Sequence, residues 1–125
     1  MEPLKQFFFD TYALVEIALG NERYLPYATE VGMIVTKFNL MEFHYSLLRT
    51  CGKEAADIQY DQLLPFVIEV SDEVIKRANE LKLVFKERKL SYVDCIGYVM
   101  AKLIGIKFLT GDIQFKDMEN IEYVH

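Results

Sequence analysis

The stretch 90-LSYVDCIGYVMAKLIGIKFLTGDIQF-115 carries the clearest structural information in the chain. Ser91 is followed three residues later by Asp94, a spacing that is typical of a capping box at the start of a helix. Apolar residues then recur at helical spacing as far as Gly105, which is expected to end the helix. Residues 107–109 form a short apolar run that predicts a buried strand, and Asp112 follows this run closely. The stretch therefore predicts a helix that leads into a strand, with an acid at each of two junctions.

The rest of the chain alternates short apolar runs with helical stretches in the same way. Further buried strands are expected at residues 5–9, 33–36, 66–70 and, at a sheet edge, 121–124. Further helices are expected at residues 11–19, 39–50 (with Asn39 as N-cap), 53–64 and 71–88. This order favours an α/β fold with a central, mostly parallel sheet of four to five short strands that is flanked by helices. The length of 125 residues fits a single domain that spans residues 1–125.

Charge and cysteine content limit the possible functions. The formal net charge of −5 argues against a broad basic surface for nucleic acids, although bound cations would reverse the charge at an acidic site. Residues 76–89 are rich in Lys and Arg, so they form either a local basic face for RNA or a solvated helix surface. Cys51 and Cys95 are too few for a disulfide framework or a zinc site, so free thiols in a reducing cytosol are expected. No apolar run approaches the roughly 18 residues of a membrane span, so a cytoplasmic protein without membrane contact is expected.

Acids stand at the ends of predicted strands, where parallel α/β sheets place their sites. Asp10 directly follows the strand at residues 5–9, and Asp112 follows the strand at residues 107–109. A carboxylate that loses solvation there needs a cation or a hydrogen-bond donor, and oxygen ligands suit Mg²⁺ or Mn²⁺. This pattern makes the acids candidates for a divalent-metal site.

Each acid also has a local structural explanation. Asp10 could be the N-cap of the following helix, and Glu42 lies early in its helix, where the helix dipole favours acids. Asp94 has a place in the capping box with Ser91, and Asp112 could be an ordinary turn residue. These alternatives remain open for every acid taken singly.

Other polar residues are weighed beside these acids. Glu16 is expected to be exposed, and Asp117 could approach the cluster or lie in a solvated loop. His44 is two residues after Glu42 and should therefore point to another side of the helix. No Ser-His or Cys-His pair is apparent, which argues against covalent catalysis.

Three segments together resemble the PIN domain family. These are 7-FFFDTYALVEIALG-20, 39-NLMEFHYSLL-48 and the stretch 90–115, and 121-IEYV-124 looks like the last strand of the family. The resemblance implies a PIN-like three-layer fold with a quartet of acids, which would be Asp10, Glu42, Asp94 and Asp112. By the same resemblance Thr110 accompanies the last acid, Thr11 is expected to orient Asp10, and Asp117 is a supporting residue.

The resemblance also implies a function. A PIN domain of this length is similar to VapC-type toxins, so the chain is expected to be a divalent-metal-dependent endoribonuclease of a type II toxin-antitoxin pair. Its substrate would be RNA, cut to leave 5′-phosphate and 3′-hydroxyl ends, with Asp10 and Asp94 binding Mg²⁺ or Mn²⁺ directly. Glu42 and Asp112 would complete the shell or orient waters. A cognate antitoxin and a homodimer are the expected partners, with residues 24–35 or the first helix as the dimer contact.

Three alternatives compete with this interpretation. The chain could be an RNA-processing PIN nuclease without an antitoxin, or a catalytically silent PIN module that only binds. A phosphatase of the haloacid-dehalogenase type would need a second Asp where Tyr12 stands.

Overall fold

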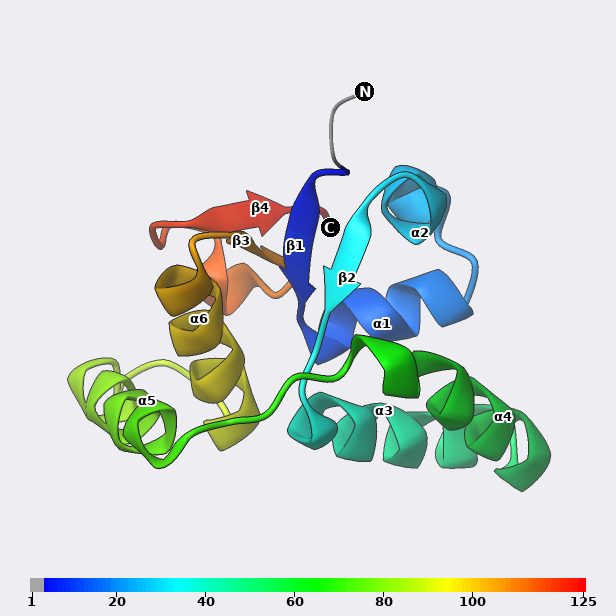
Figure 1. Cartoon of the computed structure of the whole chain (residues 1–125), viewed down its shortest axis with the longest axis horizontal. Helices are drawn as coiled ribbons and strands as arrows, with labels where there is room; N and C mark the ends of the chain where they lie inside the picture. Colours follow the sequence, from blue (N-terminus) through cyan, green and yellow to red (C-terminus); the bar gives the residue numbers. More distant parts are fainter. Residues whose placement is uncertain (1–3) are drawn as a thin grey trace.

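The computed structural model describes residues 4–125, which form a four-stranded sheet with helices on both faces (Figure 1). All strand pairs are parallel, and the strand order is β2-β1-β3-β4. The strands are β1 (Gln6–Phe9), β2 (Gly32–Ile34), β3 (Lys107–Thr110) and β4 (Ile121–Tyr123). The predicted α/β fold with a parallel sheet is therefore confirmed, with four strands.

The helices occupy nearly all of the connections between strands. The α-helices are α1 (Thr11–Ala18), α2 (Leu25–Thr29), α3 (Lys37–Thr50), α4 (Lys53–Leu63), α5 (Asp72–Val84) and α6 (Tyr92–Ile104). Short 3-10 helices are η1 (Glu22–Tyr24), η2 (Leu64–Phe66) and η3 (Ile113–Phe115). Figure 1 shows α1, α3 and α4 on one side of the sheet and α5 and α6 on the other, which gives three layers.

Each face of the sheet has its own apolar core. Successive side chains of a strand point to opposite faces, so Phe7 and Phe9 pack with α1 and α3 while Phe8 packs with α5 and α6. Leu109 and Phe108 of β3 divide between the two faces in the same way. Burial on both faces explains why the buried parts of β1 and β3 are continuous apolar runs instead of alternating.

Helix α6 lies unusually close to the sheet because of Gly97. A Cβ atom at this position would come within 2.7 Å of the Phe8 ring and 2.9 Å of the Phe108 ring. Only a residue without a side chain leaves room for this approach. The close packing fixes the start of α6, and with it Asp94, relative to β1 and β3.

The expected strand at residues 66–70 is wrong. Leu64–Phe66 form the 3-10 helix η2, and only Val67 makes a bridge, to Val35. The chain turns into α3 directly after Val35, so no longer strand is available for pairing. Ile68 and Val70 are apolar because they pack against the second core, where the backbone is irregular.

Two expected helix boundaries also differ from the structure. Thr36, not Asn39, is the N-cap of α3, and Asn39 takes part in the capping box as its third helical residue. Helix α5 ends at Val84 instead of reaching Arg88, and Phe85 is its C-cap. Charged residues continue past the end of α5, so charge pattern alone extends the predicted helix too far.

No helix within residues 4–125 has the length and apolar character that a membrane crossing requires. Both cysteines are free thiols, with Cys51 exposed and Cys95 buried in α6.

Candidate active site

Three of the four predicted acids line one cavity at the carboxyl ends of β1 and β3. Asp10 follows β1, Asp112 follows β3, and Asp94 lies in the first turn of α6. The cavity has a volume of about 330 Å³. Its lining residues are Asp10, Thr11, Tyr12, Val15, Glu16, Ser46, Asp94 and Asp112. The parallel order of β1 and β3 is what brings these distant segments to the same edge of the sheet.

Asp10 is held on both sides of its carboxylate. The residue is 2% exposed, its Oδ1 accepts a hydrogen bond from the backbone N–H of Thr11 at 2.8 Å, and its Oδ2 accepts one from the hydroxyl of Thr110 at 2.7 Å. Burial raises the pKa of Asp10 well above its usual value, and the charge of Asp94 raises it further. An ionised carboxylate in this position is one that a nearby cation would stabilise.

Asp94 takes part in the capping box of α6 and also lines the cavity. The backbone N–H of Ser91 donates to Oδ2 of Asp94 at 2.9 Å, and the backbone N–H of Asp94 donates to Oγ of Ser91 at 3.0 Å. The predicted capping box is therefore confirmed, and it engages Oδ2 alone. Burial raises the pKa of Asp94 to about 6, with further contributions from the charges of Glu42 and Asp112.

Glu42 lies beside the cavity and is held by a buried polar network. The hydroxyl of Thr11 donates to Oε1 of Glu42 at 2.8 Å, and Nδ2 of Asn39 donates to the Thr11 hydroxyl at 3.3 Å. The other end of the Asn39 amide accepts hydrogen bonds from the backbone N–H of Thr36 at 3.1 Å and from its hydroxyl at 2.8 Å. Thr11 contacts Asp10 as expected, through its backbone N–H, while its hydroxyl binds Glu42.

The Thr110 hydroxyl connects two of the acids. It donates to Asp10 and accepts from the backbone N–H of Asp112 at 3.0 Å. Oδ1 of Asp112 in turn accepts from the backbone N–H of Gln114 at 2.9 Å, which caps η3. One hydroxyl therefore fixes the distance between the ends of β1 and β3.

Asp117 does not line the cavity. Its exposed carboxylate forms a two-point ion pair with Arg88, at 2.7 Å and 3.2 Å. The guanidinium of Arg88 lowers the pKa of Asp117. The structure thus gives this acid a partner outside the cluster.

Some cavity residues escaped the sequence analysis. Glu16 lines the cavity and is half-buried, contrary to the expected exposure, and Ser46 and Tyr12 also line it. Helical spacing could have found Ser46, because it is one turn after Glu42. Glu16 is one turn after Tyr12, so these two residues could have been found only together. The role of Asn39 depends on a hydrogen bond between helices, and spacing within one helix does not predict that.

The donor set fits a hydrated divalent cation. Carboxylate oxygens suit Mg²⁺ and Mn²⁺, and Mg²⁺ usually keeps several waters while it binds one or two carboxylates. Within residues 4–125 no group of three or more His, Cys, Asp or Glu side chains is placed so that it could hold a metal ion together. The cavity instead presents separate acids around a space of about 330 Å³, which suits an ion bound partly through water.

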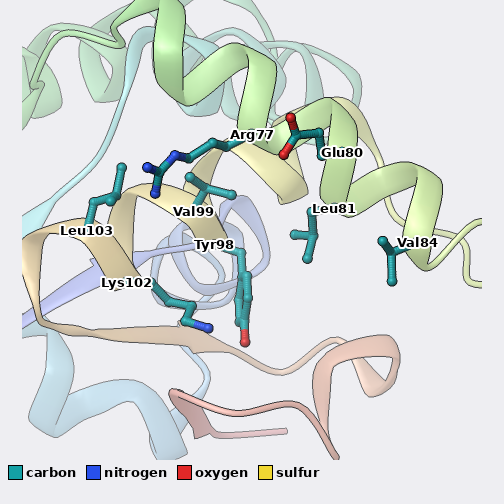
Figure 2. A pocket seen from close by; sticks show the side chains of 8 residues that line it. All are labelled: Arg77, Glu80, Leu81, Val84, Tyr98, Val99, Lys102 and Leu103. Carbon is teal, nitrogen blue, oxygen red and sulfur yellow. The ribbon is translucent and has the colours of Figure 1, made fainter.

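A second cavity, of about 480 Å³, lies between α5 and α6 and has a different chemistry (Figure 2). Its lining residues are Arg77, Glu80, Leu81 and Val84 from α5, and Tyr98, Val99, Lys102 and Leu103 from α6. Most of this lining is apolar, and Lys102 is 3.9 Å from Glu119. A lining with a single carboxylate offers much less to a divalent cation than the acidic cavity does.

The histidine near Glu42 points away from the cavity, as predicted. Nε2 of His44 lies 2.7 Å from Oδ1 of Asp57, and its ring packs edge-on against Tyr60. This contact joins α3 to α4 and leaves the acidic cavity without a histidine among its lining residues.

Comparison with known proteins identifies similar sequences and folds. Residues 7–121 match the family model of the PIN domain. The structure of VapC20 from Mycobacterium tuberculosis, a Sarcin-Ricin loop cleaving toxin, is similar with a TM-score of 0.72 and 21% identity, over 88% of this chain and 91% of that one.

Two further solved structures share the fold. A toxin-antitoxin complex from Klebsiella pneumoniae has a TM-score of 0.70 and 18% identity, over 93% of this chain and 95% of that one. VapBC2 from Rickettsia felis, bound to a DNA fragment from its promoter, has a TM-score of 0.70 and 19% identity, over 95% and 97% of the two chains. A search of curated proteins gave no match.

Proposed function

This chain belongs to the PIN domain family, and we propose that it is an endoribonuclease that hydrolyses RNA phosphodiester bonds with Mg²⁺ or Mn²⁺. The cations would be held by Asp10, Glu42, Asp94 and Asp112. One observation carries the proposal: acids from three separate elements line a single cavity, where burial and mutual repulsion raise the pKa of Asp10 and Asp94. Such an arrangement favours cation binding over a purely structural role.

The protein groups would act by fixing the acids. Asp10 and Asp94 would bind the ions directly, since backbone and hydroxyl donors hold each carboxylate in one orientation. Glu42 and Asp112 would complete the shell or orient waters. When bound, divalent cations supply Lewis acidity that stabilises charge on the attacking and leaving oxygens of an in-line displacement.

The proposed reaction is direct hydrolysis. The oxygen of water forms a bond to phosphorus while the bond between phosphorus and the 3′ oxygen breaks. One proton of this water goes to the 3′ oxygen, so the products are a 3′-hydroxyl and a 5′-phosphate, the ends that the family resemblance implies.

The structure offers little for a covalent mechanism. Burial raises the pKa of Cys95 to about 11, so this thiol is protonated at neutral pH. His44 is engaged with Asp57 on the side of α3 that does not line the cavity. Both observations favour attack by water over attack by a side chain.

We also propose that the chain is a VapC-type toxin with a cognate antitoxin, that it forms a homodimer and that it acts in the cytosol. The similar structures from Klebsiella pneumoniae and Rickettsia felis, both of toxin-antitoxin systems, support the antitoxin partner. A short gene directly upstream whose product binds this chain would support the toxin assignment. A chain that acts without such a partner would instead be an RNA-processing nuclease.

The test is cleavage of end-labelled RNA by the native chain and by Asp94→Asn, with and without Mg²⁺ or Mn²⁺. Asparagine keeps an oxygen for the capping bond from Ser91 but removes the charge. We expect metal-dependent cutting that disappears in this variant while its thermal unfolding stays cooperative. Asp72→Asn, an exposed acid in the first turn of α5, is the matched control and should cut normally.

Two results would contradict the proposal. Retained cutting in Asp94→Asn would show that the reaction does not need the Asp94 carboxylate. A folded native chain that binds neither Mg²⁺ nor Mn²⁺, measured by titration calorimetry, would instead support the silent binding module.

A further inference from the structure

Two half-buried tyrosine rings, an exposed histidine ring and two exposed cations gather beside the acidic cavity, at the carboxyl ends of β3 and β4. We name this surface the aromatic–cation strip, and its members are Tyr12, Arg23, Lys116, Tyr123 and His125. They come from four separate segments: α1, η1, the end of η3 and the chain from β4 onward. The acidic quartet contains none of them.

The chain after β4 is anchored at the edge of the cavity. Tyr123 lies opposite Thr110 in the sheet, and the backbone N–H of Val124 donates to the carbonyl of Thr110 at 2.9 Å. The hydroxyl of Tyr24 donates to the carbonyl of Val124 at 2.5 Å. Because Thr110 also donates to Asp10, the strip is connected to the acids through a single residue.

Tyr12 belongs to the cavity and to the strip. It lines the cavity, and its hydroxyl lies 3.3 Å from Nδ1 of His125. Burial raises the pKa of Tyr12, and its neighbours Glu16 and Tyr123 raise it further. The tyrosine is therefore near an acid of the cavity on one side and the rings of the strip on the other.

The rings and the cations are arranged together. The rings of Tyr123 and His125 are nearly parallel, with 14° between their planes and 6.3 Å between their centroids. Nζ of Lys116 lies 5.5 Å from the centroid of the Tyr123 ring. Arg23 is exposed, and its Nη1 donates to the main-chain oxygen of His125 at 3.2 Å.

The basic segment at residues 76–89 is the competing surface for RNA, and several of its cations already have partners. Arg77 pairs with Glu73, and Arg88 pairs with Asp117. Lys82 donates to the carbonyl of Leu90 at 2.7 Å. The two carboxylate partners reduce what the segment can offer to a phosphate, whereas the ion pairs found within residues 4–125 include neither Arg23 nor Lys116.

We propose that the aromatic–cation strip binds single-stranded RNA beside the bond that is cut, with bases stacked on Tyr123 and His125 and phosphates near Arg23 and Lys116. This inference rests on the proposed function and names the form of its substrate. Flat side chains combined with cations bind unpaired bases of any sequence, since every base has a face that can stack. Base-paired RNA offers no free base faces and should bind here less well.

The test measures affinity separately from cutting. Fluorescein-labelled oligoadenylate and oligouridylate are titrated with the Asp94→Asn chain in Mg²⁺, and binding is followed by fluorescence anisotropy. Into this background we introduce Tyr123→Leu, Tyr123→Phe and His125→Leu. Leucine keeps apolar bulk without a flat ring, while phenylalanine keeps the ring, so the pair separates stacking from general packing.

We expect Tyr123→Leu and His125→Leu each to weaken oligoadenylate binding about tenfold, and Tyr123→Phe to bind as the parent does. The preference for oligoadenylate over oligouridylate should shrink in the leucine variants, because adenine stacks more strongly. Lys116→Gln should lower the slope of log affinity against log salt concentration by about one.

The matched control lies on another face of the molecule. Tyr45 of α3 is an exposed ring that, like Tyr123, has a cation over it, since Arg49 lies 5.8 Å from its centroid. Tyr45→Leu should leave the RNA affinity unchanged. Thermal unfolding of every variant identifies any loss that comes from misfolding, and Tyr123→Phe and His125→Leu provide the test if Tyr123→Leu fails to fold.

The outcomes separate this inference from the proposed function. Unchanged affinity in both leucine variants overturns the strip, even if the native chain cuts RNA. Unchanged RNA affinity with weakened self-association in sedimentation overturns it as well and assigns the surface to a protein partner. Lost affinity in the leucine variants supports the strip, even if the native chain does not cut and the proposed function fails.

Discussion

The four acids in and beside the cavity hold their polar groups differently from the aromatic–cation strip. We call these acids, Asp10, Glu42, Asp94 and Asp112, the wall. In the wall, Asp10 and Glu42 accept hydrogen bonds of 2.7 to 2.8 Å from the half-buried Thr11 and the buried Thr110. In the strip, the contacts of Tyr12 and Arg23 with His125 are 3.3 Å and 3.2 Å long and exposed. Under the proposed roles, the groups for chemistry are fixed from inside the fold, while the side chains for binding RNA are held by longer, exposed contacts.

The largest predicted effect comes from removing a charge in the wall. Asp10→Asn should reduce RNA cutting by at least about a thousandfold, because the remaining acids cannot replace a direct ligand. The same variant should unfold at a higher temperature than the native chain at neutral pH without divalent metal, since burial raises the pKa of Asp10. Cutting assays and thermal unfolding measure the two opposite changes. A variant that is both inactive and less stable would show that Asp10 acts mainly as a helix cap.

A smaller effect is predicted for the network behind Glu42. Thr11→Val keeps the shape of the side chain but removes the hydroxyl between Asn39 and Glu42. The Mg²⁺ concentration for half-maximal cutting should rise about 10- to 100-fold, as is typical when a ligand loses its supporting hydrogen bond. Thr11→Ser keeps the hydroxyl and should restore the native value. Equal losses in both variants would show that the methyl group, not the hydroxyl, matters.

The pH dependence of stability tests the burial of the acids in the wall and the repulsion between them. A carboxyl group with a higher pKa in the folded chain makes the free energy of unfolding fall as the pH rises. For Asp94 this fall runs from 3.8, its ordinary value, to about 6, and Asp10 acts in the same direction. The unfolding temperature of the metal-free native chain, minus that of Asp94→Asn, should therefore decrease over this range.

Added Mg²⁺ should raise the unfolding temperature more above pH 6 than below it, because the Asp94 carboxylate is ionised above its pKa of about 6. Thermal scans across the pH range with and without Mg²⁺ measure this difference. The lowered pKa values of Asp57 and Asp117 act below 3.8, so they do not obscure the window. A stabilisation by Mg²⁺ that is independent of pH would place the ion elsewhere.

Gly111 separates the wall from the strip, and a side chain there should disturb both. A Cβ atom would come within 2.3 Å of Cε1 of Tyr12 and within 2.3 Å of the carbonyl oxygen of Val124. Gly111→Ala should lower the free energy of unfolding by about 1–3 kcal/mol, the usual cost of overpacking. Urea denaturation measures this loss. An unchanged stability would mean that the chain after β4 moves away easily and is not firmly anchored.

The smallest effect is expected at Asp117, which the family resemblance makes a supporting residue and the structure pairs with Arg88. Asp117→Asn should leave metal-dependent cutting unchanged, and as a loss of one exposed ion pair it should shift the unfolding temperature only slightly. A loss of cutting comparable to that of Asp94→Asn would show that Asp117 takes part in the active site.

The sequence predicts the structure best where a short-range pattern determines the position of a residue. Short-range patterns predict three features that the structure confirms: the strand at residues 5–9, the capping box of Ser91 and Asp94, and the end of α6 at Gly105. Asp10 and Asp112 could be placed at one edge because parallel strands share a direction. The expectation that these acids lie close together needed no knowledge of strand order.

Long-range contacts explain what the sequence could not predict. Apolar residues 66–70 looked like a strand, but the chain has no neighbouring strand long enough to pair with them. Asn39 looked like an N-cap because its residue type favours that place, yet its amide joins Thr36 to Thr11 across two helices. The catalytic roles of the four acids stay predictions until cutting and metal binding are measured.

The double use of the carboxylates has a consequence for how this protein could change over generations. Asp10, Asp94 and Asp112 each accept a backbone N–H at the start of a helix, so a descendant that no longer cut RNA would still be selected to keep them for folding. Glu42 starts no helix, and its contact is with the Thr11 side chain. In a lineage that loses activity, Glu42 should be the first of the four acids to vary. It is therefore the most informative position for distinguishing active relatives from silent ones.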